Sequence, residues 1–272
     1  MNPSFANAPE SDSPGFYHRS GSDPSLPSLV MLHGLFGKLT NFEPVLPHIL
    51  PQIDVWVPEL PLYSDQDGTD TVAGLSRWLS SWLEKNGIET AVLLGNSLGG
   101  HIALDCAIGG NDRVQGLILV GSSGLFDTGF GDSIPRRFDR DYIRQKASEA
   151  FHNYEVDSDM VEEIHGVITN RLLLGKLVRL ARSARQANTE PMLPHIAVPT
   201  CIVWGENDRI TPPQVARKFH SLIPGSDLKW IPDCGHVPMM EQPKTFASIL
   251  NDILLGFTDQ TESIHHSIHS IN

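Results

Sequence analysis

The sequence has few features that would direct the chain to a membrane or to the secretory route. Its first ten residues contain no basic region followed by an apolar run, so they do not resemble a signal peptide. No stretch is long and apolar enough to cross a bilayer. The three cysteines are too few for a disulfide framework and lack the close spacing of metal ligands. These absences predict a protein of the reducing cytoplasm that holds no metal.

Positive charge is also scarce. The chain has 20 Lys and Arg against 32 Asp and Glu, which gives a formal net charge of −12, and its basic residues form no run. A surface of this sign repels nucleic-acid phosphates and anionic lipid headgroups. We therefore expect neither a nucleic acid nor a membrane as a partner, while the oligomeric state is not defined by the sequence.

The 272 residues, of which 40% are hydrophobic, are enough for one large core with an insertion. Short apolar runs bounded by turn residues alternate with segments of helical period. Runs that are apolar on both faces are typical of a parallel sheet. The runs predicted to be strands are residues 28–32, 53–57, 91–94, 116–120 and 201–204. Apolar stripes from Val72 to Leu83 and from Phe246 to Leu254 predict helices that cover a wound α/β sheet.

Composition divides the chain into a core and three other segments. Residues 1–15 are rich in Pro, Ser, Asp and Asn and are predicted to form a flexible arm. Residues 122–195 show no convincing strand and are dense in charge and helix formers, so we expect a helical cap between core segments 16–121 and 196–257. Residues 258–272, with three histidines, are predicted to be a flexible polar tail rather than a metal site.

A candidate nucleophile lies in residues 95–100, GNSLGG, between a buried apolar run and a helix-like segment. A serine at such a sharp turn adopts a strained backbone that projects its hydroxyl, while glycines on either side let neighbouring elements approach. The N–H of Leu98 would point into the same space from a helix N-terminus, which favours an anion. The pattern alone is also typical of a glycine-rich turn, but its position at the end of a buried strand favours a site at Ser97.

Three further segments support this interpretation: residues 31–37, MLHGLFG; residues 203–212, VWGENDRITP; and residues 231–243, IPDCGHVPMMEQP. Together with GNSLGG, and in this order, they resemble the α/β-hydrolase family over roughly residues 16–257, apart from the insertion. The resemblance implies an α/β-hydrolase fold, with a mostly parallel, doubly wound sheet and a helical cap.

The resemblance also implies roles for individual residues. Ser97 would be the nucleophile, Asp208 the orienting carboxylate and His236 the base, in the chain order that the family shows. Glu206 is a nearby alternative to Asp208, but it lies closer to the strand end than the family's acid usually does. The oxyanion donors would be the N–H groups of Leu35 and Leu98. His33 would be a structural histidine beneath the oxyanion loop.

These residue types suit acyl transfer. A serine hydroxyl is a weak nucleophile until an imidazole takes its proton, and a carboxylate must hold that imidazole in one tautomer. Two N–H donors then stabilise the charge that develops on the substrate's carbonyl oxygen, so neither a metal nor an organic cofactor is required. The apolar residues next to these motifs, Phe36, Val237 and Met240, are predicted to contact the acyl group, although packing in the core is the alternative for Met240.

We predict a carboxylesterase whose substrate is a small-molecule ester with a small or medium acyl group. The alternative is a hydrolase of carbon–carbon bonds in ring-fission products, which needs a cation for the substrate's carboxylate. Val237 departs from the aromatic residue that such hydrolases often have after the histidine. A perhydrolase would use the same triad, and a small-molecule receptor without turnover could share the fold.

Four cap arginines bear on this choice. In an esterase they should face solvent or pair with Asp157, Asp159, Glu162 or Glu163, because a buried unpaired arginine is costly. The four are Arg171, Arg179, Arg182 and Arg185. Residues 58–63, PELPLY, also lack the glycine that the family commonly has there, which leaves the shape of that pocket border open.

Overall fold

The computed structural model describes residues 15–125 and 136–269, with side chains described as far as residue 257. Except for Gly15, the predicted N-terminal arm lies outside these ranges. Among the described helices, none combines the length and the hydropathy of a membrane span.

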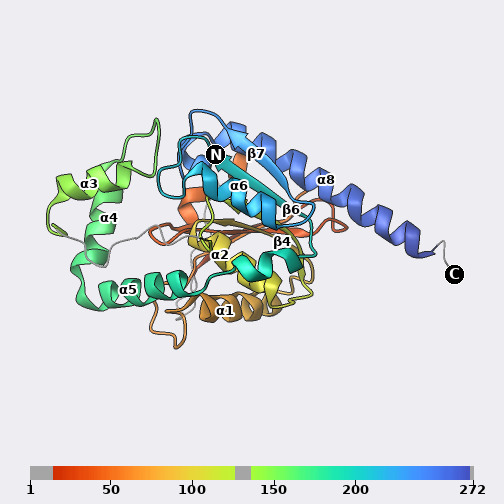
Figure 1. Cartoon of the computed structure of the whole chain (residues 1–272), viewed down its shortest axis with the longest axis horizontal. Helices are drawn as coiled ribbons and strands as arrows, with labels where there is room; N and C mark the ends of the chain where they lie inside the picture. The colour runs from red at the N-terminus through yellow and green to blue at the C-terminus, as the bar shows by residue number, and fades with distance from the viewer. Residues whose placement is uncertain (1–14, 126–135, 270–272) are drawn as a thin grey trace.

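A single seven-stranded sheet forms the centre of the molecule (Figure 1), in the order β1-β3-β2-β4-β5-β6-β7. Neighbouring strands are parallel except that β1 is antiparallel to β3. The strands are β1 (Phe16–Arg19), β2 (Ser28–Leu32), β3 (Val55–Pro58), β4 (Ala91–Asn96), β5 (Val114–Val120), β6 (Thr200–Gly205) and β7 (Asp227–Ile231). The predicted doubly wound, mostly parallel sheet is confirmed.

Helices cover both faces of the sheet. Consecutive strand residues point to opposite faces, so Leu29 and Met31 join one apolar cluster while Val30 and Leu32 join the other. Helices α1 (Val72–Lys85), α2 (Leu98–Ile108) and α6 (Pro213–Leu222) pack into the second cluster, and α8 (Pro243–His269) packs into the first. The shorter elements are α7 (Pro238–Glu241) and the 3-10 helices η1 (Leu39–Phe42), η2 (Leu46–His48) and η3 (Glu190–His195). Because both faces are covered, every residue of β4 and β6 is buried.

The segment between β5 and β6 contains helices and, in its described part, no strand. The helices are α3 (Arg140–Ser148), α4 (Ser158–Thr169) and α5 (Arg171–Gln186), and they gather at one end of the sheet (Figure 1). Each begins at a side chain that accepts backbone N–H bonds of its first turn: Asp139, Asp157 and Asn170, respectively. Residues 126–135 of the predicted cap lie outside the described ranges.

The C-terminal end differs from the sequence prediction. Helix α8 continues to His269, so residues 258–269, predicted to be a flexible tail, are helical and extend beyond the sheet (Figure 1). After Gly256 the sequence has neither Pro nor Gly, so no residue in this stretch stops the helix. The polar composition that suggested a tail is equally typical of a solvated helix.

Candidate active site

Ser97 occupies a strained turn between β4 and α2. Its backbone angles are φ 55° and ψ −116°, a region that a residue with a Cβ adopts only when the surroundings enforce it. The Ser97 N–H donates to the Val120 carbonyl at 3.0 Å, and the Ser97 carbonyl accepts from the Ser123 N–H at 3.1 Å. A Cβ on Gly99 would lie 2.2 Å from the Leu32 oxygen, so only glycine allows α2 to start this close to β2. The turn therefore has the geometry that the GNSLGG motif predicts.

Asp208 and His236 meet in the loops that follow β6 and β7. The His236 Nδ1 lies 2.8 Å from Asp208 Oδ2, and the two residues are 6% and 3% exposed. The other carboxylate oxygen, Oδ1, accepts the N–H groups of Ile210 at 2.8 Å and Thr211 at 2.9 Å, which fixes the carboxylate plane. Glu206, the alternative acid, is exposed. The geometry thus selects Asp208 as the partner of the histidine.

Gly121 lets β5 approach this pair. Its φ is 51°, and a Cβ there would lie 2.8 Å from His236 Nδ1 and 3.1 Å from Asp208 Oδ2. Asn96, the residue before Ser97, donates through Nδ2 to the carbonyls of Val120 and His236, both at 3.0 Å. The ends of β4 and β5 and the histidine loop are therefore held together, which places Ser97, Asp208 and His236 at one edge of the sheet. Sequence reasoning did not identify Asn96, although it directly precedes Ser97.

Thr211 is a second residue that the sequence analysis missed. Its hydroxyl lies 2.9 Å from Asp208 Oδ2, 3.0 Å from the Gly121 carbonyl and 3.2 Å from His236 Nδ1. One hydroxyl proton can serve only one acceptor at a time, so it donates to the carboxylate or to the carbonyl. In either case Thr211 holds the carboxylate–imidazole pair against β5. Its position three residues after Asp208 is the sequence signal that could have identified Thr211.

The predicted oxyanion turn borders Ser97, since a Cβ on Gly34 would lie 3.2 Å from Ser97 Cβ. The Gly34 carbonyl accepts from the Gly37 N–H at 3.0 Å and from His33 Nδ1 at 2.9 Å. That carbonyl and the Leu35 N–H belong to one trans peptide unit, so the N–H points away from both donors. The N–H of Leu98 belongs to the first turn of α2, where N–H groups have no partner within the helix.

His33 has one tautomer in this arrangement. The Leu60 N–H donates to Nε2 at 2.9 Å, so Nδ1 carries the proton and donates to Gly34. The side chain is 1% exposed, and burial lowers the pKa of His33 although Glu59, 3.9 Å away, acts in the opposite direction. Protonation would place a hydrogen on Nε2, so that two donors, Nε2–H and the Leu60 N–H, would face each other. A neutral His33 therefore supports the predicted donor turn from beneath.

The predicted pocket residues lie beside this site. Val237 is 8% exposed, directly after the histidine, and Phe36 and Met240 are half-buried against the same apolar cluster. Met239 is 1% exposed and belongs to the core. Contact of Phe36, Val237 and Met240 with a substrate stays a prediction.

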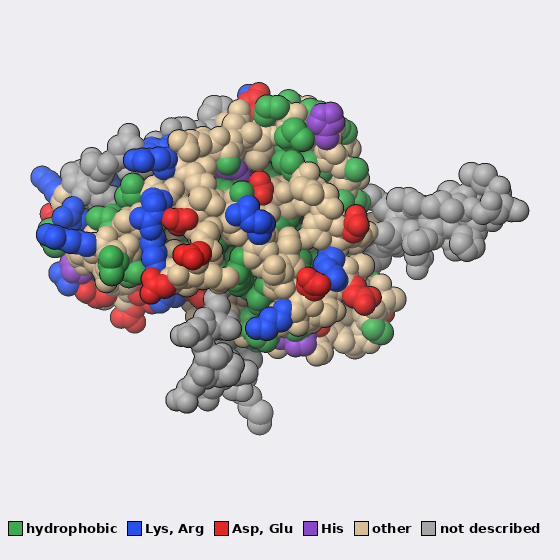
Figure 2. All heavy atoms as spheres, turned by 90° about the horizontal axis from the view of Figure 1, so that it is seen from below, with side chains coloured by type: hydrophobic (Ala, Val, Ile, Leu, Met, Phe, Trp, Pro, Cys, Tyr) green, Lys and Arg blue, Asp and Glu red, His purple; other side chains and the backbone are tan. Residues whose placement is uncertain are grey.

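The cap arginines lie on α5, which carries no Asp or Glu, and Figure 2 shows Lys and Arg gathered at the cap end beside carboxylates. Arg171 and Arg182 are exposed, and Arg185 is half-buried. Arg179 is exposed and pairs with Asp70 at 2.6 Å. The exposure of Arg171 and Arg182 and the ion pair of Arg179 agree with the prediction that these arginines face solvent or are paired. Three of the acids named as available partners have other contacts: Glu162 pairs with Arg140, Glu163 with Lys38, and Asp157 caps α4.

Within the described residues, no three or more His, Cys, Asp or Glu side chains are grouped to hold a metal ion. The cysteines Cys106, Cys201 and Cys234 are free and buried. Burial raises their pKa values to about 11, about 12 and about 12, so none is a reactive thiolate.

Comparisons with known proteins agree with this fold. The sequence model described as the alpha/beta hydrolase family matches residues 29–249. The chain is 24% identical over 261 residues to the uncharacterized hydrolase YugF of Bacillus subtilis, covering 89% of this chain and 95% of that protein. It is 25% identical over 250 residues to the 2-hydroxy-6-oxo-6-phenylhexa-2,4-dienoate hydrolase of Burkholderia cepacia, covering 84% and 87%.

Two solved structures extend the comparison. The α/β hydrolase MGS-MChE2, from a lagoon-sediment metagenome of Mar Chica, Morocco, is 34% identical with a TM-score of 0.71, over 91% of this chain and 95% of that one. A thermophilic esterase from Thermogutta terrifontis is 21% identical with a TM-score of 0.69, over 89% and 93%. The second likeness concerns the fold alone.

Proposed function

Because the chain belongs to the α/β-hydrolase family, we propose that it is a serine hydrolase that cleaves small or medium acyl esters through an acyl-enzyme on Ser97. The observation that carries this proposal is the strained Ser97 turn at the sheet edge where Asp208 and His236 form a buried pair. A strained serine beside a buried acid–base pair is the arrangement that activates a hydroxyl.

The mechanism follows from the tautomer of His236. Because Asp208 accepts the Nδ1 proton, Nε2 is the ring nitrogen that takes the proton from the Ser97 hydroxyl. The serine oxygen then bonds to the acyl carbon, and the carbonyl electron pair moves onto its oxygen, facing the N–H groups of Leu35 and Leu98. Nε2 returns the proton to the departing alcohol. A water molecule repeats the sequence, breaks the acyl–Ser97 bond and releases the acid.

A specific observation supports an ester rather than a ring-fission acid. Arg171, Arg179 and Arg182 are exposed and Arg185 is only half-buried. A carboxylate of a ring-fission product would need a cation within the pocket, whereas an ester with an apolar acyl group would not.

The carbon–carbon hydrolase remains the second candidate because of the relatives. The Burkholderia cepacia protein and a Klebsiella pneumoniae protein, 27% identical, are both named as hydrolases of hydroxy-oxo-dienoate compounds. Ligand binding without turnover is a further alternative that the ester panel and the fluorophosphonate probe separate from catalysis, and a perhydrolase would use the same triad.

The helical segment between β5 and β6 is proposed to be the cap that selects the acyl group. The His236 N–H donates to the Ala150 carbonyl at 2.7 Å, and Lys38, beside the oxyanion turn, pairs with Glu163 of α4 at 2.7 Å. We also propose a small-molecule substrate, a cytoplasmic location and no nucleic-acid or membrane partner, which the net charge of −12 supports.

The test is a panel of p-nitrophenyl esters of rising acyl length, run beside one ring-fission diketone and a fluorophosphonate probe. We expect turnover of short and medium esters and labelling that Ser97→Ala abolishes. Labelling with cleavage of the diketone alone would favour the second candidate. Absence of labelling in the folded wild-type chain would refute Ser97 as an activated nucleophile.

A further inference from the structure

The carbonyl of Leu35 is held by a side chain from outside the oxyanion turn. The Tyr63 hydroxyl, in the loop after β3, donates to this oxygen at 2.8 Å. Burial raises the pKa of Tyr63 far above its ordinary value, with Glu59 acting in the same direction, so the hydroxyl remains a donor. The ring packs against both apolar clusters, which fixes the position from which the hydroxyl acts.

Both peptide groups that flank Leu35 are therefore fixed. The Gly34–Leu35 unit is held at its carbonyl by Gly37 and His33, and the Leu35–Phe36 unit is held at its carbonyl by Tyr63. Two fixed peptide planes leave little freedom to the backbone angles of Leu35, and hence to the direction of its N–H. An oxyanion donor acts only when it is aimed at the position that the charged oxygen will occupy.

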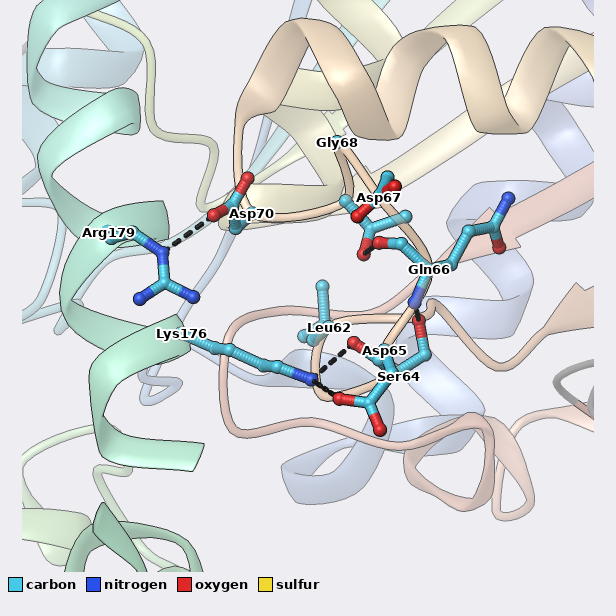
Figure 3. A pocket seen from close by; sticks show the side chains of 10 residues that line it. Leu62, Ser64, Asp65, Gln66, Asp67, Gly68, Asp70, Lys176 and Arg179 are labelled. Atoms are coloured by element: carbon cyan, nitrogen blue, oxygen red, sulfur yellow. Dashed lines mark hydrogen bonds and ion pairs between the residues drawn. The ribbon is translucent and has the colours of Figure 1, made fainter. Parts of the chain in front are cut away.

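The cap holds Tyr63 in turn. Lys176 of α5 donates through Nζ to the carbonyls of Tyr63 at 3.2 Å and Ser64 at 2.5 Å, and to Asp65 Oδ1 at 2.7 Å. Its side chain is 16% exposed, and three acceptors use all three donors of an ammonium group. Figure 3 shows Lys176 reaching from α5 to Ser64 and Asp65, while Arg179 reaches from the same helix to Asp70. These residues line a pocket of about 120 Å³ between the helix and the loop.

We propose that Tyr63 is a positioning residue that aims the oxyanion donor of Leu35, and that Lys176 links the cap helix α5 to this function. The inference rests on the proposed serine-hydrolase mechanism. Tyr63 makes no bond to the substrate's reacting atoms in this scheme, since it acts through the Leu35 carbonyl. The expected consequence is a defect in the step where charge develops on the substrate oxygen, with little change in ground-state binding.

The decisive variant is Tyr63→Phe in the full chain, because it removes one oxygen and keeps the packed ring. On the best ester we expect kcat to fall about tenfold with KM within about twofold, less than the 10²–10³-fold loss of a whole donor. Phosphonylation of Ser97 and affinity for a trifluoromethyl ketone, which forms a charged tetrahedral adduct, should fall by a similar factor. Amide hydrogen exchange of residues 33–37 should rise in the folded variant.

Two matched controls separate this role from general loosening. Tyr154→Phe removes the same oxygen from a half-buried ring that stacks on Phe151, and it should leave kcat unchanged. Lys176→Met should lower kcat in the same direction by about threefold, whereas Arg179→Gln, which breaks a bridge from the same helix to Asp70, should not.

The outcomes decide the proposal. Wild-type rates of phosphonylation and turnover in Tyr63→Phe would overturn it. A higher KM and a lower kcat with unchanged affinity for the ketone would overturn it as well. Should Tyr63→Phe fail to fold, the same measurements of turnover, phosphonylation and ketone affinity on Lys176→Met decide. A wild-type chain that the phosphonate does not label would refute the nucleophile and this inference together, whereas a labelled wild type with an unaffected Tyr63→Phe refutes the inference alone.

Discussion

Replacing Glu241 by alanine is expected to loosen the loop that carries His236, the proposed base. The Glu241 carboxylate accepts the N–H of Gly235, next to His236, at 2.8 Å. It also accepts the N–H groups of His152 at 3.0 Å and Asn153 at 2.5 Å, in the segment between α3 and α4. One half-buried side chain therefore joins the loop of His236 to the helical segment between β5 and β6. A Cβ on Gly235 would lie 2.7 Å from the Ala150 oxygen, which shows how closely the two segments pack.

The expected loss can be estimated from these contacts. A hydrogen bond to a charged group contributes roughly 1.5–3 kcal/mol when it is buried, and less when solvent can replace the acceptor. Glu241 is half-buried and has three N–H donors, so we expect the free energy of unfolding to fall by about 2–4 kcal/mol. Misplacement of the histidine should lower kcat by at least tenfold.

Urea unfolding of wild type and Glu241→Ala, with kcat and KM on the same ester, measures both effects. Glu163→Gln is the matched control, because this exposed glutamate also joins the cap to the core, through Lys38, and should change stability by less than about 0.5 kcal/mol. A Glu241→Ala chain as stable as this control, with wild-type kcat, would show that the three N–H groups do not depend on the carboxylate.

Four other predictions use simpler measurements. Ser97→Ala or His236→Ala should lower kcat by about a million-fold, and Asp208→Ala should lower it less. A Ser97→Ala chain that keeps more than a tenth of the activity would contradict the mechanism. Gln at Arg171, Arg179, Arg182 or Arg185 should change kcat/KM on a neutral ester less than about tenfold; a larger loss confined to the diketone would favour carbon–carbon cleavage. Exchanging residues 122–195 for the cap of another esterase should change the preferred acyl length, and an unchanged preference would count against a selecting cap. Burial lowers the pKa of His33 and of His101, so on acidification the unfolded chain binds protons before the folded chain does. The contribution of these two histidines to the free energy of unfolding is therefore fully present above about pH 6.5 and declines as the pH falls toward their folded-state pKa values. The urea midpoint should therefore be lower at pH 5.5 than at pH 7.5, with part of the difference absent in His101→Leu, and a pH-independent midpoint would contradict it.

The central strands could be predicted because burial on both faces leaves an uninterrupted apolar run. The edge strands β1 and β7 gave weaker signals, since their residues, apart from the buried Ile231, alternate between exposed and partly buried positions. The roles of Ser97, Asp208 and His236 were predicted from the resemblance of four local motifs to the α/β-hydrolase family, and the structure brings Asp208 and His236 into contact.

Other parts of the site depend on contacts between distant segments. Asn96 and His236 are 140 positions apart, and Tyr63 and Leu35 are 28 apart. In each pair a side chain bonds to a backbone carbonyl, and a carbonyl does not depend on the identity of its residue. A sequence pattern therefore indicates only one member of such a pair. The same reason hid Glu241, which accepts from three backbone N–H groups besides the Cys234 thiol.

The use of cations on α5 bears on the substrate. The Lys176 side chain is 16% exposed, and all three of its donors are engaged by the loop after β3. Arg179 is paired with Asp70, and Arg171 and Arg182 are exposed. A substrate carboxylate bound by Lys176 would have to displace Asp65 and two carbonyls, and it would release Tyr63 from its support. The two carbonyl bonds are part-buried and Asp65 is exposed, so the main cost of recruiting this lysine would be the lost support of Tyr63 and of the proposed oxyanion turn. A neutral acyl ester makes no such demand on α5, and the arrangement of these cations therefore favours an ester over a ring-fission acid as the substrate.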